Sequence, residues 1–323
     1  MTCPIEVLVL FDRPGWCYAR RAVALLKYQP PDVRVRMEAL AGASDEQVED
    51  WIVTTDVVLL LDYVQTDRIA QALRRGAMAG RKPKLVVSFN ADEKRRIDVW
   101  EGLIRNPGVD RVVCVNKARH ETEIDTFLSP CHPLQGPVLA AKVHPRTFIG
   151  NGVDTDDFYP ETPIAPRPER CLWIGSRRQS RIKGYDDVLE PLEALLGRAG
   201  FDSHFIQDRD WDTHKMRHFY NSGAYILCAS LSEGTANTVL EGVACGCLAV
   251  TTPVGSVLEW GRDGENCVVV QDRTPEAFLA ALEKARERRA ALAEAGMAAV
   301  RKGWAWAVKA QEYYDLFRRL VER

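Results

Sequence analysis

The sequence predicts an α/β protein made of two doubly wound, Rossmann-like domains. Short runs of leucine and β-branched residues alternate with amphipathic helical segments, a pattern typical of parallel sheets covered by helices on both faces. Four prolines between Pro160 and Pro168 interrupt this alternation, which then restarts. A length of 323 residues is sufficient for two domains of about 150 residues each.

The first half of the chain contains the strands and helices of one such domain. The expected strands are Ile5–Phe11, Val33–Ala39, Val57–Leu61, Lys84–Phe89, Arg111–Val115 and Val138–Val143. The expected helices between them are Trp16–Tyr28, Glu46–Val53, Thr66–Gly80, Glu93–Arg105 and Ala118–Leu128. Right-handed crossovers through these helices give a doubly wound sheet.

The second half has the same architecture without an obvious sequence repeat. Its expected strands are Cys171–Ile174, Ser203–Ile206, Ala224–Cys228, Leu248–Thr251 and Cys267–Val270. Its expected helices are Asp186–Arg198, Thr213–Asn221 and Ala236–Cys245. A last helical region starts at Pro275, and we expect glycines to interrupt it near Gly296 and Gly303.

The composition argues against several classes of function. A formal net charge of -2 gives no reason to expect a nucleic-acid partner. No apolar run approaches the roughly 18 residues of a membrane span, and the first residues are too strand-like for a signal peptide. The nine cysteines include no C-x2-C pair, which favours reduced cysteines in a cytosolic protein.

We therefore expect a cytoplasmic protein that is at most peripheral at the inner face of a membrane. The basic cluster between Arg74 and Lys84 is explained either by a solvated helix end or by weak contact with anionic lipid or an acidic acceptor.

Two glutamates, Glu233 and Glu241, lie eight residues apart around the start of an expected helix. The strand Ala224–Cys228 precedes them, so they follow the carboxyl end of a strand. The N–H groups and the dipole at such a helix N-terminus suit a diphosphate. Eight helical residues span about 12 Å, so one carboxylate can reach sugar hydroxyls and the other a ribose diol. The alternative is a helix with two surface glutamates.

The segment SEGTANTVLEGVACGCLAVTTPVGSVLEW, residues 232–260, resembles the E-x7-E region of retaining GT-B glycosyltransferases, specifically the large family four of that class. Residues 149–160 look like the I-x-N-G-V-D-x-x-x-F-x-P linker of that family. Residues 173–177, followed by Lys183-Gly184-Tyr185, look like the segment that opens its second domain.

The resemblance implies a GT-B fold, in which two domains face each other across a cleft. Residues 1–150 would be the acceptor-side domain, joined by a C-terminal helix over 304–323 that crosses back to it. Residues 151–303 would bind the nucleoside diphosphate sugar, a UDP- or GDP-sugar. The implied reaction moves a hexose to an acceptor hydroxyl with retention, in glycan, glycolipid or glycoconjugate synthesis. The acceptor would be a sugar, a lipid-linked glycan or a small molecule.

The resemblance also implies roles for single residues. Lys183 and an arginine would meet the diphosphate, with Arg177 favoured over Arg178 and Arg181. Glu233 would contact the sugar and Glu241 the ribose. Asn90 lies where the family often has a catalytic histidine. The other implied donor-binding residues are Gly15, Gly175, Gly234, Thr235, Ala236, Asn237 and Thr238.

No cofactor and no metal ion are expected, because cations and helix ends handle the diphosphate in this fold class. Asp208-Arg209-Asp210 matches the D-x-D sequence pattern, but its position in the chain does not suit a metal-bound diphosphate. None of the six histidines occupies a convincing catalytic position. No G-x-G-x-x-G follows the first strand, which argues against a dinucleotide oxidoreductase.

Two alternatives stay open. The single glycine of the turn at Gly15 and the missing histidine are compatible with a catalytically weak subunit that binds a nucleotide sugar without transferring it. A phosphorylase or an epimerase of the same fold is the second alternative.

Overall fold

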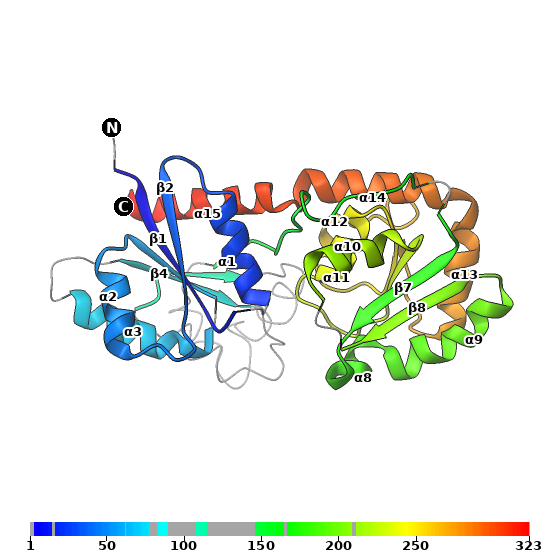
Figure 1. The fold of residues 1–323 in the computed structure, drawn as a ribbon, viewed down its shortest axis with the longest axis horizontal. Coiled ribbons are helices and arrows are strands. Elements are labelled where there is room, and N and C mark those ends of the chain that lie inside the picture. The colour runs from blue at the N-terminus through cyan, green and yellow to red at the C-terminus, as the bar shows by residue number, and fades with distance from the viewer. Residues whose placement is uncertain are drawn as a thin grey trace, which may run out of the picture. The chain divides into compact units, whose positions relative to one another are not determined.

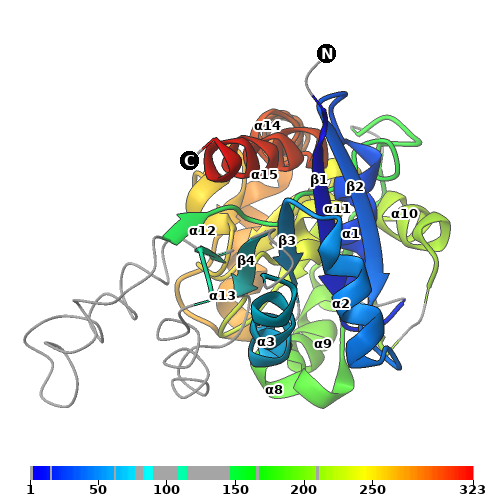
Figure 2. The ribbon, with the colours of Figure 1, turned by 90° about the vertical axis from the view of Figure 1, so that its left-hand side faces the viewer.

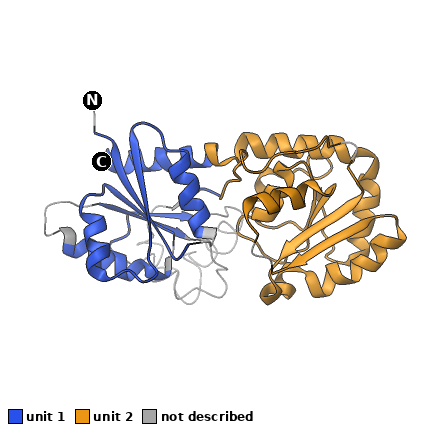
Figure 3. Cartoon of the chain, viewed as in Figure 1, with its two compact units in different colours: residues 1–150, 309–323 blue, residues 151–308 orange. Residues whose placement is uncertain are grey.

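The computed structural model describes residues 3–14, 17–61, 63–77, 83–89, 108–114, 146–164, 167–208 and 211–322. The chain divides into two compact units, one of residues Met1–Gly150 with Lys309–Arg323 and one of residues Asn151–Val308 (Figure 3). The expected strand Val138–Val143 and the expected helices Glu93–Arg105 and Ala118–Leu128 lie outside the described residues.

The first unit contains a parallel sheet in the order β2-β1-β3-β4-β5-β6 (Figure 1). Strand β6 was not expected from the sequence, because it has only three residues and no hydrophobic alternation. The six strands are β1 Ile5–Phe11, β2 Val33–Ala39, β3 Val57–Leu60, β4 Lys84–Phe89, β5 Arg111–Cys114 and β6 Arg146–Phe148. The α-helices among the described residues of this unit are α1 Cys17–Lys27, α2 Asp45–Val53, α3 Thr66–Ala77 and the greater part of α15 Trp306–Val321.

Hydrophobic residues on both sides of this sheet explain its burial. All four residues of β3 are buried, as expected for a central parallel strand covered on both faces. Leu8, Val58 and Leu85 share one core cluster with Ile52 of α2 and with residues of α3. The helices α2 and α3 pack side by side (Figure 2).

Helix α15 packs in the first unit through its aromatic residues. Tyr313, Tyr314 and Phe317 are fully buried. The Tyr314 hydroxyl donates a hydrogen bond to the Leu25 carbonyl of α1. The C-terminal helix was expected over residues 304–323, but the observed helix begins at Trp306. Trp304 packs instead in the core of the second unit.

The second unit contains a parallel sheet in the order β11-β10-β9-β7-β8. Its five strands are β7 Arg170–Gly175, β8 Asp202–Gln207, β9 Tyr225–Cys228, β10 Leu248–Thr251 and β11 Val268–Val269. Its helices are α8 Ser180–Lys183, α9 Glu190–Arg198, α10 Thr213–Asn221, α11 Asn237–Ala244, α12 Val257–Trp260, α13 Pro275–Ala285 and α14 Arg289–Gly303.

Alternate residues of each strand face opposite layers of helices. Leu172 and Ile226 pack with α10 and α11, whereas Trp173 and Leu227 pack with α9 and α13. This period of two is the property of an extended strand, and here both sets of side chains are apolar because both faces are covered.

The strand order places a ligand-binding position within the second unit. From β7 the chain crosses to β8 at one side and then to β9 at the other. The loops that follow β7 and β9 therefore diverge from neighbouring strand ends, which is the switch point where doubly wound sheets bind ligands. No helix in the described part of the chain is long and apolar enough to cross a membrane.

The expected interruption near Gly296 is wrong, because α14 runs unbroken from Arg289 to Gly303. A Cβ atom at Gly296 would lie 2.5 Å from the Asn266 carbonyl oxygen. The glycine therefore permits the helix to approach this loop closely. The second expected interruption is confirmed, since α14 ends at Gly303.

Substituting Gly296 tests this close approach. Gly296→Ala is expected to lower the free energy of unfolding by about 1–3 kcal/mol, since backbone must move to admit the methyl group. Gly303→Ala is the matched control, because no atom lies within 4 Å of a Cβ at that position. Urea unfolding should show the control unchanged or slightly stabilised, and equal losses in both variants would contradict the steric explanation.

Candidate functional site

An ion pair lies at the switch point of the second sheet. The Nζ atom of Lys183, at the end of α8, lies 2.6 Å from Oε1 of Glu233, in the loop after β9. The two side chains are 25% and 13% exposed. The structure thus brings together two of the residues that the sequence analysis selected, although they are fifty positions apart.

The pair is electrostatically coupled. Burial by itself would lower the pKa of Lys183, but the attraction of Glu233 and its hydrogen bond outweigh burial and raise that pKa above its usual 10.5. Lys183 therefore carries a positive charge at neutral pH.

Backbone and hydroxyl contacts fix the loop that carries Glu233. The Ser230 hydroxyl donates to Glu233 Oε1 at 2.7 Å. The Thr252 hydroxyl, beyond β10, in turn contacts the Ser230 carbonyl at 2.6 Å. The Leu231 N–H donates to the Ile182 carbonyl at 2.8 Å, which ties this loop to α8. Ser230 and Thr252 therefore support Glu233, and only a structure could show these contacts.

Two glycines permit the close packing around this pair. Gly184 ends α8 with a φ of +77°, and a Cβ there would lie 2.2 Å from the Ala229 carbonyl oxygen. Gly255 has a φ of +56°, and a Cβ there would lie 2.9 Å from the Cβ of Glu233. Larger residues would separate α8 and the loop after β10 from the loop after β9.

Arg273, which the sequence analysis did not select, links the same segments. Its guanidinium donates to the Ala229 carbonyl at 2.6 Å and to the Arg181 carbonyl at 3.1 Å. It also forms an ion pair with Asp187. Arg273 therefore holds α8 against the end of β9. No local sequence signal identifies it, because its partners lie between 44 and 92 residues away.

The N-terminus of α11 lies directly after the Glu233 loop. The expected helix started at Ala236, but Ala236 is its N-cap and has φ 51° and ψ 57°, a left-handed conformation unusual for a residue with a Cβ. Alanine supplies no capping side chain, so it does not occupy the N–H groups of the first turn. Such a turn offers donors and a positive dipole to an anion.

The residues before this helix are held by hydrogen bonds. The Asn151 N–H, at the start of the linker, donates to the Thr235 hydroxyl at 3.2 Å. The Ser256 hydroxyl donates to the Thr235 carbonyl. Thr235 is buried, whereas Asn237 at the start of the helix is exposed. Gly234 packs against Gly255, whose Cβ would lie 2.9 Å from the Gly234 oxygen.

Glu241 is fixed by a buried tyrosine. The Tyr220 hydroxyl, on α10, donates to Glu241 Oε2 at 2.8 Å. Burial, and then the nearby Glu241 carboxylate, raise the pKa of Tyr220 well above its usual value, so the hydroxyl keeps its proton and acts as a donor. Tyr220 is a further residue that the sequence analysis did not select.

Arg177 lies on the surface of the second unit, just after β7. Its Nε atom donates to Gln207 Oε1 at 3.1 Å, and its backbone N–H donates to Asp208. Its side chain is 78% exposed. Gly175, at the end of β7, packs on Trp173, where a Cβ would lie 2.4 Å from the indole ring.

Some of the residues selected from the sequence lie outside the described part of the chain. Gly15 and Asn90 are among them, as are Arg209 and Asp210 of the D-x-D letters.

Two left-handed glycines provide a test of the packing at Lys183. Gly184 and Gly200 both have a φ of +77°, but a Cβ at Gly200 meets no atom within 4 Å. Alanine at either position costs about 1–2 kcal/mol in backbone strain. Gly184→Ala is expected to cost a further 1–3 kcal/mol or so from the clash with Ala229. Thermal or urea unfolding checks this, and equal destabilisation of the two variants would refute it.

The pH dependence of stability tests the ion pair. Lys183→Met is expected to cost about 1.5–3 kcal/mol near neutral pH, because Glu233 loses its charged donor. Since the folded pKa of Lys183 is raised, this contribution is fully present below pH 10.5 and is lost as the pH rises through the folded pKa. The difference in unfolding free energy between wild type and variant should therefore shrink at alkaline pH. The exposed Lys302→Met is the control, and a difference that grew with pH would contradict the pairing.

Known proteins resemble this chain in sequence and in fold. Residues 170–287 match the family described as "Glycosyl transferases group 1". Over 202 residues the chain is 27% identical to one of the subunits of the phosphatidylinositol N-acetylglucosaminyltransferase of Arabidopsis thaliana. This match covers 55% of the chain and only 42% of that relative.

Solved structures of similar fold cover almost the whole chain. The Anabaena protein HepE, in complex with UDP and glucose, has a TM-score of 0.70 at 12% identity over 97% of this chain and 99% of its own. The catalytic domain of starch synthase IV from Arabidopsis thaliana, bound to ADP and acarbose, has a TM-score of 0.65 at 13% identity over 100% of both chains. The chain, with its two parallel sheets, thus has the GT-B fold, and residues 170–287 are similar to the group 1 glycosyltransferases.

Proposed function

We propose that the protein transfers a hexose from a nucleoside diphosphate sugar to an acceptor hydroxyl, with retention of the anomeric configuration. The observation that carries the proposal is the Lys183–Glu233 pair, which lies beside the N-terminus of α11 at the switch point of the second sheet. The bound UDP, glucose and ADP of the structural neighbours are compatible with a nucleotide sugar at such a site.

Lys183 and α11 are suited to the diphosphate of the donor. In this proposal the Lys183 ammonium exchanges Glu233 for a phosphate oxygen, and the first turn of α11 donates N–H groups to the phosphate. Both groups stabilise the negative charge that develops on the departing nucleoside diphosphate. This arrangement neutralises the diphosphate without a metal ion, and the departing phosphate itself receives the proton of the acceptor hydroxyl.

Glu233 and Glu241 have separate roles in the proposal. Glu233, released from Lys183, accepts hydrogen bonds from sugar hydroxyls. Glu241 accepts hydrogen bonds from the ribose diol, with Tyr220 holding the other side of the carboxylate in a fixed orientation. Charge-assisted hydrogen bonds of this kind fix an orientation as well as adding affinity.

Arg177 would supply a second cation for the diphosphate. Its side chain is largely exposed, so it can leave Gln207 and Asp208 at the cost of weak surface contacts only. This role ranks below that of Lys183, whose ammonium is already within the site.

Substitution of the two glutamates tests the proposed roles. Glu233→Ala is expected to lose most of the sugar transfer, by about 100-fold or more, while UDP or GDP still binds. Glu241→Ala is expected to weaken binding of the nucleotide itself about tenfold or more, because a charged hydrogen bond is lost. The exposed Glu265→Ala serves as the control.

The measurements are calorimetric titration with UDP, GDP and ADP and their glucose conjugates, together with release of nucleotide from each sugar donor. Absence of binding to every nucleotide and every nucleotide sugar would overturn the proposal. Binding without hydrolysis or transfer across a broad panel of acceptors would instead favour the subunit that binds a nucleotide sugar without turnover.

A further inference from the structure

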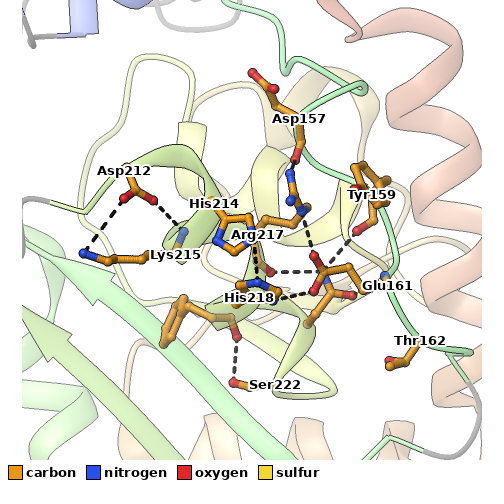
Figure 4. Close-up of polar contacts among 12 residues, drawn as sticks. Asp157, Tyr159, Glu161, Thr162, Asp212, His214, Lys215, Arg217, His218 and Ser222 are labelled. Carbon is orange, nitrogen blue, oxygen red and sulfur yellow. Dashed lines mark hydrogen bonds and ion pairs between the residues drawn. The ribbon is translucent and has the colours of Figure 1, made fainter.

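A pair of histidines lies on α10, outside the site described above. His214 and His218 are one helical turn apart, and both are exposed. Their Nε2 atoms are 2.9 Å apart, and their rings meet edge to face (Figure 4). Two imidazoles four residues apart on one helix face can present nitrogen lone pairs to the same point.

A carboxylate fixes the orientation of the second ring. The Nδ1 atom of His218 lies 2.6 Å from Oε2 of Glu161, in the segment that precedes β7. Burial by itself would raise the pKa of Glu161, but its hydrogen bonds with Arg217 and His218 outweigh burial and lower that pKa. An ionised Glu161 accepts the Nδ1 proton of His218, so Nε2 of a neutral His218 carries a lone pair that faces His214.

This combination is the arrangement that proteins use for imidazole ligands of metal ions. A ligating histidine almost always donates its other ring N–H to a carboxylate or a carbonyl, which fixes the tautomer and makes the ligand more basic. Here one proton joins the two Nε2 atoms, and a cation can take its place once His214 carries its own proton on Nδ1. Two Zn–N bonds of about 2.05 Å in tetrahedral geometry place their nitrogens about 3.3 Å apart. The two Nε2 atoms, now 2.9 Å apart, would therefore have to separate by only about 0.4 Å.

The charges around the pair do not oppose a cation. The neighbouring cations are Lys215 and Arg217, each of which has a carboxylate partner. Arg217 pairs with Glu161 at 2.8 Å, and Lys215 lies 3.9 Å from Asp212, the N-cap of α10 (Figure 4). Arg217 also donates a hydrogen bond to the backbone carbonyl of Asp157. Among the described residues, the carboxylates of Glu161 and Asp212 therefore offset these two cationic side chains.

The geometry points to a binding site for a divalent transition-metal ion such as Zn²⁺ at His214 and His218, with Glu161 orienting His218. Imidazole nitrogen suits Zn²⁺, Cu²⁺ and Ni²⁺, whereas Mg²⁺ and Ca²⁺ prefer oxygen ligands. In the described residues no group of three or more His, Cys, Asp or Glu side chains is arranged for a metal ion, so water would complete the coordination. The site is separate from the proposed donor site and does not depend on it.

A cation at this position would act on two segments at once. Glu161 directly follows the linker, and Arg217 also donates to the carbonyl of Asp157 within the linker. Helix α10 continues to Tyr220, which holds Glu241. Zinc would therefore stiffen the contact between this segment and the helix that supports Glu241.

The direct test is calorimetric titration of the whole chain with ZnCl2 at about pH 7.5. His214→Ala and His218→Ala are each expected to weaken zinc binding more than tenfold or so, because each removes one of two protein ligands. Glu161→Gln is expected to weaken it about tenfold, since the orienting charge is lost while an acceptor oxygen remains. Lys215→Ala, an exposed change between the two ligands, is the matched control.

Further readouts separate this site from other zinc ligands such as thiols. Zinc should raise the melting temperature of the wild type but not of the double variant His214→Ala/His218→Ala, and MgCl2 should raise neither. Binding should weaken at about pH 5.5, because the imidazoles must be neutral to bind the metal. Circular dichroism without metal checks that the variants are folded. Equal zinc affinity in the wild type and the folded double variant would overturn the inference.

Discussion

The Lys183–Glu233 ion pair is the interaction around which the second unit is arranged. A partly buried pair gains little by itself, because the loss of hydration offsets most of the attraction between the charges. Its position has to be fixed by the surrounding structure. Gly184 and Arg273 hold the lysine segment against the end of β9. Ser230 donates to Oε1 of Glu233, the same carboxylate oxygen that Lys183 contacts.

The same contacts explain why a site can exist here without a deep rearrangement of the sheet. The two loops start from adjacent strands, β7 and β9, and diverge because the chain crosses the sheet in opposite directions. Opposite charges then meet in the space between the loops. Under the proposed function, a negatively charged ligand would exchange with Glu233 at Lys183 while the rest of the network keeps its hydrogen bonds.

Local sequence patterns predicted the fold well and the site in part. Mainly apolar runs such as Lys84–Phe89 and Leu248–Thr251 predicted the strand limits correctly, because buried parallel strands are largely apolar on both faces. Lys183 and Glu233 were selected because each belongs to a short motif within a single segment of the chain. Arg273 and Tyr220 were missed because their roles arise from contacts between distant segments. Gly296 was misinterpreted, since a glycine that permits close packing and a glycine that ends a helix look alike in a sequence.

The division of helix α15 between the two units has a consequence for biosynthesis. Tyr313, Tyr314 and Phe317 belong to the core of the first unit, although residues 1–150 leave the ribosome long before them. The first unit therefore has an open apolar surface over α1 until residues 309–321 have been synthesised. All residues of the second unit, 151–308, are synthesised before the last residues of the first unit. The part of the chain made first is thus the last to finish folding, and it is exposed to chaperones and proteases for longest.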